Sequence, residues 1–123
     1  MTTSSELFGE VISSYSRAQA IEDGILVDVT ETAREAGIKY PVALTRAVFE
    51  KCVALPKRYR GLEDVKGRLW DVLSMFRFAA RIASADTIRY KLIVSRRTVI
   101  LKAVIGPGDT PEPVITIMLP EED

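Results

Sequence analysis

The spacing of hydrophobic residues changes along this chain from a helical period to a period of two. Helical spacing and helix-capping residues in the first two-thirds predict helices at 17–22, 30–37, 45–55 and 65–83. Alternating segments rich in β-branched residues predict strands at 25–29, 87–95, 98–105 and 114–119. This order predicts an α+β fold, with the helices of the first two-thirds packed on a C-terminal antiparallel β-meander of three to four strands.

The segment 65–83 gives the strongest helical pattern and separates into two faces. Its wide apolar arc consists of Leu69, Val72, Met75, Phe76, Ala79, Ile82 and Ala83. Its narrow remaining stripe consists of Lys66, Trp70, Ser74, Arg77 and Arg81. A Trp among Arg side chains on a polar stripe is typical of an interface anchor, but coverage by a neighbouring helix or loop is the more common outcome for so large a ring.

Chain length and composition predict a single domain over residues 1–123. A hydrophobic content of 47% is sufficient for one core without metal or disulfide staples. The longest apolar runs are far shorter than the roughly 18 residues of a membrane span, and the first ten residues do not resemble a signal peptide. We therefore expect a cytoplasmic protein with no membrane partner.

The chain has no histidine and only one cysteine, Cys52. This composition excludes Ser-His-Asp and Cys-His catalytic sites, zinc sites of the Cys/His type and two-histidine iron sites. Cys52 lies on the apolar face of its predicted helix, which favours a packing role. Asp28, Glu31 and Glu35 could form a carboxylate metal site, but a helix N-terminus and a solvated helical face explain their spacing better. We expect no catalytic residue, metal or cofactor.

Opposite charges occupy different parts of the sequence. Residues 1–56 carry five Lys and Arg against eight Asp and Glu, residues 57–102 carry twelve against four, and residues 103–123 carry none against five. The three blocks have net charges of −3, +8 and −5, although the whole chain is neutral. The basic belt at 57–102 would attract an anionic partner in a way that the overall charge does not reveal.

The belt combines cations with aromatic rings, as surfaces that bind nucleic acid do. The alternative is a solvated loop between two helices. The candidate binding residues are Lys57, Arg58, Tyr59, Arg60, Lys66, Trp70, Arg77, Arg81, Arg96 and Arg97.

Three segments resemble a family of small bacterial proteins of unknown function that occur on plasmids, prophages and other mobile elements. They are YSRAQAIEDGILVDVTETAREAGIKYPVALT, RLWDVL and GPGDTPEPVITIMLP, and the resemblance covers roughly residues 11–120. It implies a setting, because accessory genes of mobile elements often act on host defence, conjugation or DNA maintenance. It supplies no catalytic residue, and it implies that relatives carry a longer basic insertion where this chain has Ser95-Arg96-Arg97.

These observations favour a non-enzymatic accessory protein that binds nucleic acid or a host machine for nucleic-acid processing or defence. An anti-CRISPR-like inhibitor would be one form of it. One alternative is a small nuclease-like enzyme that works without histidine. A second alternative is a structural homo-oligomer.

Overall fold

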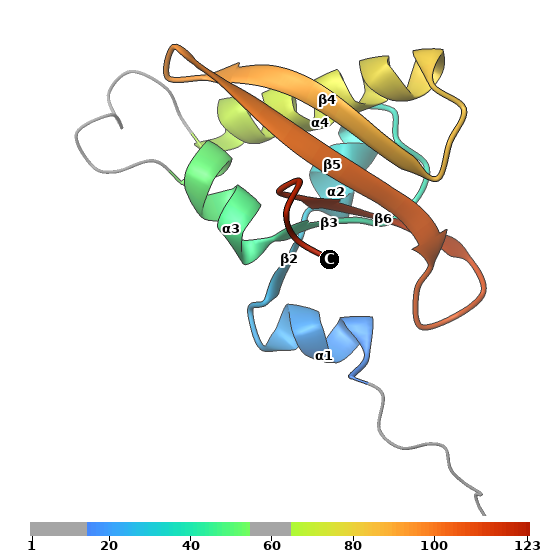
Figure 1. Ribbon diagram of the computed structural model, residues 1–123. Helices are drawn as coiled ribbons and strands as arrows, with labels where there is room; N and C mark the ends of the chain where they lie inside the picture. The colour runs from blue at the N-terminus through green and yellow to red at the C-terminus, as the bar shows by residue number, and fades with distance from the viewer. Residues whose placement is uncertain (1–14, 55–64) are drawn as a thin grey trace, which may run out of the picture.

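A five-stranded mixed sheet forms the centre of the structure, a computed structural model that describes residues 15–54 and 65–123 (Figure 1). The strand order is β2-β3-β6-β5-β4. The strands are β2 (Leu26–Asp28), β3 (Val42–Thr45), β4 (Thr87–Val94), β5 (Arg97–Pro107) and β6 (Pro113–Met118). The last three strands form an antiparallel meander, and β6 pairs in parallel with β3. The predicted α+β fold with a C-terminal meander is confirmed.

The helices precede the meander in the chain, as predicted. They are α1 (Arg17–Glu22), α2 (Thr30–Glu35), α3 (Arg46–Val48), the π-helical segment η2 (Phe49–Val53) and α4 (Val65–Ile82). The long α4 runs behind β4 and packs against it (Figure 1). None of the helices in the described ranges has the length and apolar character needed to cross a membrane.

Capping residues begin α1 and end α1 and α2 where the sequence predicts, whereas Thr30, expected as the N-cap of α2, is its first helical residue, and the N-cap Val29 makes no side-chain capping hydrogen bond. Ser16 forms a capping box with Gln19 at the start of α1. The Asp28 carboxylate accepts hydrogen bonds from the backbone nitrogen and hydroxyl of Thr30 at the start of α2. Gly24 and Gly37 follow α1 and α2 with φ angles of +81° and +90°, a conformation that glycine adopts without steric cost.

One hydrophobic core lies between the sheet and the helices behind it. Leu44, Leu73, Leu101 and Ile117 are fully buried and come from β3, α4, β5 and β6. Along β4, burial alternates strictly with exposure, as expected for a strand with one face on the core. The Tyr90 hydroxyl at its centre donates to the carbonyl oxygen of Val72 at 3.0 Å and so connects β4 to α4.

Three of the sequence predictions are wrong in detail. The strand β3 was not predicted, and the helix predicted at 45–55 is the shorter pair α3 and η2. The predicted strands 87–95 and 98–105 put the tight turn at Arg96 and Arg97, but the turn consists of Ser95 and Arg96, with φ angles of 49° and 68°, and Arg97 already belongs to β5. Positive φ at both central positions is the pattern of a type I′ hairpin turn, which identifies Ser95 and Arg96 as the turn residues.

The buried face of α4 also differs from the predicted arc. Arg68 and Leu73 are buried, whereas Met75 and Ile82 are 39% and 76% exposed. The helix carries more apolar residues than one packed face can cover, and contact with β4 selects the face that is covered. The other apolar residues of α4 are left on its outer side.

Candidate functional site

One flank of α4 carries four of the candidate binding residues. Lys66, Trp70, Arg77 and Arg81 are all exposed, and their helical spacing places them within one stripe. Trp70 retains 40% exposure, so the described residues do not bury it. We call these four residues the α4 stripe.

Arg77 packs against the end of α2 within this stripe. A Cβ atom on Gly37 would lie 2.9 Å from Nε of Arg77 and 3.0 Å from its Cζ. The guanidinium of Arg77 therefore rests on bare backbone at Gly37. This contact positions Arg77.

Arg96 and Arg97 lie at the tip of the β4–β5 hairpin, where both are exposed. The chain reverses between α4 and β4, and the Tyr90 hydroxyl reaches the carbonyl of Val72. The hairpin tip is therefore near the end of the molecule where α4 begins (Figure 1). The fold thus places the hairpin tip toward the N-terminal end of α4, where the stripe begins (Figure 1).

Arg81 lies at the opposite end of α4. With a rise of 1.5 Å per residue, the backbones of Lys66 and Arg81 are about 22 Å apart. The stripe is thus elongated and suits an extended anionic partner better than a small anion. The candidates Lys57, Arg58, Tyr59 and Arg60 lie outside the described residues.

Sequence reasoning did not distinguish Arg68 from the exposed cations of the belt. Arg68 is only 4% exposed, and its Nε donates to the carbonyl oxygen of Val53 at 2.9 Å. It connects α4 to η2 and belongs to the interior of the protein. Helical spacing puts Arg68 beside the apolar residues Leu69 and Val72, at the border of the exposed face. This position was the one signal in the sequence that Arg68 could be buried.

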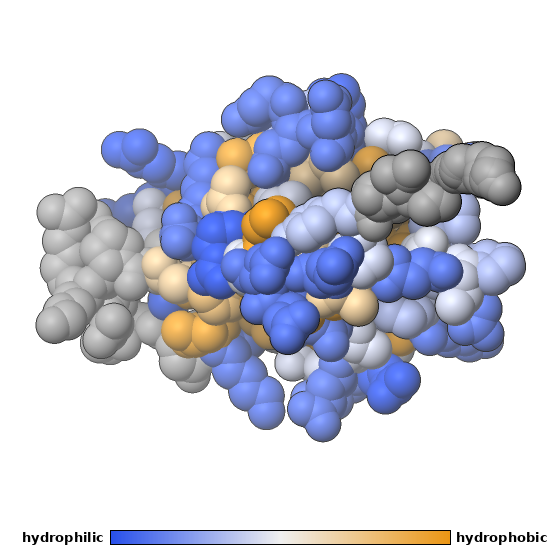
Figure 2. Space-filling view, turned by 90° about the horizontal axis from the view of Figure 1, so that it is seen from below, coloured by the Kyte–Doolittle hydropathy of each residue, from blue (hydrophilic) through white to orange (hydrophobic). Residues whose placement is uncertain are grey.

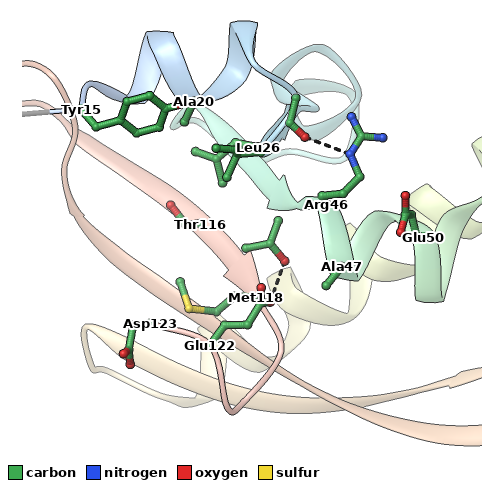
Figure 3. A pocket seen from close by; sticks show the side chains of 13 residues that line it. Tyr15, Ala20, Leu26, Arg46, Ala47, Glu50, Thr116, Met118, Glu122 and Asp123 are labelled. Carbon is green, nitrogen blue, oxygen red and sulfur yellow. Dashed lines mark hydrogen bonds between the residues drawn. The ribbon is translucent and has the colours of Figure 1, made fainter.

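A second feature is a pocket of about 720 Å³ that no sequence motif indicated (Figure 3). Side chains from α1, β2, α3, β6 and the C-terminal residues line it, including Leu26, Arg46, Met118 and Glu122. Because these residues come from elements far apart in the chain, the sequence contained no local signal for the pocket.

Hydrogen bonds within the protein engage several of the polar groups at this pocket. Arg46 Nε donates to the carbonyl oxygen of Gly24 at 2.9 Å, and the Thr45 hydroxyl donates to the Glu122 carboxylate at 2.8 Å. The Tyr15 hydroxyl donates to the Asp23 carboxylate, and this hydrogen bond is the main cause that raises the pKa of Tyr15 to about 12. The pocket's charged groups thus hold α1, α3 and the C-terminus together.

The loop after β5 also has a structural role. The Asp109 carboxylate accepts hydrogen bonds from the backbone nitrogens of Arg17 and Ala18, at 2.7 and 3.0 Å. Arg17 extends beneath α1 to the Thr116 hydroxyl and the Ile115 carbonyl, and burial lowers the pKa of its guanidinium. Figure 2, viewed from the side of α1, shows a mainly hydrophilic surface with small, separate hydrophobic patches.

Fold and surface together define a small α+β domain whose long helix exposes a Trp among cations. The chain belongs to a family of unknown function, DUF6573, whose model matches residues 6–123. No curated protein and no solved structure matches the chain.

Proposed function

We propose that this chain is a non-enzymatic accessory protein of a mobile genetic element. It acts in the cytoplasm by binding nucleic acid or a host machine that processes nucleic acid, and an inhibitor of a CRISPR effector would be one form of it. The supporting observation is the α4 stripe, which combines exposed Trp70 with the cations Lys66, Arg77 and Arg81. The hairpin-tip residues Arg96 and Arg97 extend this surface.

Each component of the surface has a physical role in binding. Exposed cations accelerate encounter with an anionic partner and align it, while contributing modestly to affinity. Trp70 offers a large apolar ring that can stack on a base or enter a pocket on a protein. Binding requires only these exposed groups. An enzyme, by contrast, would have to carry out general acid–base catalysis near neutral pH without histidine, which this chain lacks.

Binding of labelled single-stranded and duplex oligonucleotides, and of purified host nucleoprotein effectors, tests the proposal. The double variant Lys66→Glu/Arg81→Glu should weaken binding about tenfold or more and reduce the log-log salt slope by about 1 for each lost cation. Trp70→Ala should weaken binding while leaving the salt slope unchanged. Folding should be nearly unaffected, because exposed charges contribute little to stability.

The matched control is Arg34→Glu/Lys51→Glu, which reverses two exposed cations outside α4 and the hairpin. It changes the net charge equally and should retain binding. Equal losses in both double variants would show that only net charge matters and would contradict a role for the α4 stripe.

Two further measurements separate the proposal from its alternatives. Reproducible hydrolysis of RNA or DNA with magnesium or manganese, abolished by a single Arg, Tyr or Glu substitution, would replace it with the nuclease hypothesis. Light scattering that shows a stable homo-oligomer with no affinity for nucleic acid or host complexes would favour the structural alternative.

A further inference from the structure

β4 is an edge strand whose outer backbone groups are unpaired within the described residues. Ile105 donates its backbone N–H to the carbonyl of Asp86, and the tight turn pairs Val94 with Arg97. Hydrogen-bonded and non-bonded pairs alternate along an antiparallel ladder. The N–H and C=O groups of Thr87, Arg89, Lys91 and Ile93 therefore point away from β5, along the free edge of the sheet. An exposed edge of this kind can accept another strand.

An apolar flank of α4 borders this edge. Met75, Phe78 and Ile82 follow each other at helical spacing and are 39%, 60% and 76% exposed. A pocket of about 480 Å³ between α4 and the sheet edge is lined by Asp71, Met75, Lys91, Leu92, Ile93 and Thr98. The helix runs behind β4 (Figure 1), so its outer flank would lie under any strand added to the edge. Exposed apolar residues at consecutive helical turns are typical of an interaction surface.

Charge at the edge selects the type of strand that can bind. Arg89 and Lys91 are exposed on the face of β4 that points away from the core, and Arg96 and Arg97 follow at the hairpin tip. Opposite charges on neighbouring strands are stabilising, and like charges directly opposite are destabilising. A second copy paired through its own β4 would bring Arg89 and Lys91 of both chains together, so charge disfavours self-pairing and favours an acidic partner strand.

We propose that the β4 edge binds an extended acidic segment of a partner protein as a sixth strand of the sheet. Successive side chains of a strand point to opposite faces. The bound segment would therefore alternate acidic residues, facing Arg89 and Lys91, with apolar residues, facing Met75 and Phe78. The backbone hydrogen bonds supply affinity and the alternating side chains supply specificity. The inference rests on the host-machine form of the proposed function, because the bound segment would belong to a protein of that machine.

The test uses a synthetic peptide as long as β4 in which Glu alternates with Val. Binding is followed by amide NMR and hydrogen exchange of the full chain. The expected result is chemical-shift change along β4 and new protection of the amides of Arg89, Lys91 and Ile93, which point outward. The peptide with Lys in place of Glu should not bind.

Two pairs of variants separate backbone pairing from charge. Lys91→Pro removes one outward N–H but leaves the β4–β5 ladder intact, because proline is tolerated where the N–H of an edge strand faces solvent. It should weaken peptide binding about tenfold or more relative to Lys91→Gln, which lacks the charge but keeps the N–H. The double variant Arg89→Glu/Lys91→Glu should no longer bind the Glu peptide and should bind the Lys peptide instead. General damage to the fold would not produce such a reversal.

The inference is overturned if the Glu peptide does not bind, if it binds Lys91→Pro and Lys91→Gln equally, or if its shifts map away from β4. It is also overturned if sedimentation shows a dimer that Lys91→Pro dissociates, because β4 would then pair with a second copy. Failure of the proposed function has a different signature. There the peptide binds at β4, yet neither nucleic acid nor host effector complexes bind the full chain.

Discussion

At the residue scale, burial decides which reactive side chains can take part in chemistry. Cys52 is fully buried in η2, and Tyr90 is buried between β4 and α4. Burial raises the pKa of the Cys52 thiol from its ordinary value of 9.0 to about 11, and it also raises the pKa of Tyr90. Both groups are held neutral at physiological pH, and a thiol in this state is a poor nucleophile. Packing is the role that this environment supports for Cys52.

Replacing Cys52 with Ala should lower the free energy of unfolding by about 1–2 kcal/mol at pH 7 and leave binding unchanged. In the wild type, the unfolded chain loses the thiol proton at a lower pH than the folded chain. The stability due to this group is therefore complete below about pH 9 and declines as the pH rises toward about 11. Urea unfolding at increasing pH should show a shallower decline for Cys52→Ala than for the wild type. Loss of binding without loss of stability would contradict the packing role.

Gly37 is required both by its backbone angle and by its contact with Arg77. The substitution Gly37→Ala should destabilise the fold by about 1–2 kcal/mol, because an L-residue is strained at a φ of +90° and its Cβ would meet Nε of Arg77 at 2.9 Å. Gly106→Ala is the matched control, since its Cβ would have nothing within 4 Å. Thermal or urea unfolding of both variants measures the difference. In an Arg77→Ala background, Gly37→Ala should lower the free energy of unfolding by a smaller amount, because the contact with Arg77 is gone and only the backbone strain remains.

At the element scale, the sequence predicted structure well wherever the signal was local. The N-cap at Ser16, the glycine after α2 and the alternation along β4 all depend on neighbouring residues, and all are observed. β3 is only four residues long and lies between β2 and β6, the second of which is more than seventy residues further on, so it has little local signal. Among the candidate site residues, helical spacing groups the four residues of the α4 stripe, and the structure has them exposed on one flank of α4. It could not show which apolar residues of α4 would meet β4, so exposed Met75 and Ile82 were assigned to the core.

The turn between β4 and β5 should be more stable with residues suited to positive φ. Ser95→Asn/Arg96→Gly introduces the preferred pair for this hairpin and should raise the free energy of unfolding by about 1 kcal/mol. The same variant lacks one tip cation, so binding to an anionic partner should weaken. Urea unfolding and oligonucleotide or effector binding on the same samples measure both effects. If the variant is more stable but binds with unchanged affinity, Arg96 is not part of the binding surface.

At the scale of the whole molecule, a few acidic groups of the described residues accept internal hydrogen bonds, and most of the cations of 65–102 are exposed. Asp109 caps α1, Asp23 accepts from Tyr15, and the Glu122 carboxylate accepts from the Thr45 hydroxyl and the backbone nitrogen of Leu119. By contrast, Lys66, Arg77, Arg81 and the hairpin arginines are exposed. A chain with no net charge can therefore present a cationic side.

This arrangement predicts how salt acts on the rate of association. If the cationic side guides an anionic partner to its site, raising salt from about 50 to about 200 mM should slow association strongly and change dissociation little. Lys66→Glu/Arg81→Glu should slow association at low salt and converge with the wild type at high salt, where screening removes the guidance. Trp70→Ala should instead speed dissociation at every salt concentration, because the ring acts only after contact. Surface plasmon resonance with the partner immobilised separates the two rates. Salt dependence confined to dissociation would mean that the exposed cations act as local contacts in the bound complex and do not guide the approach.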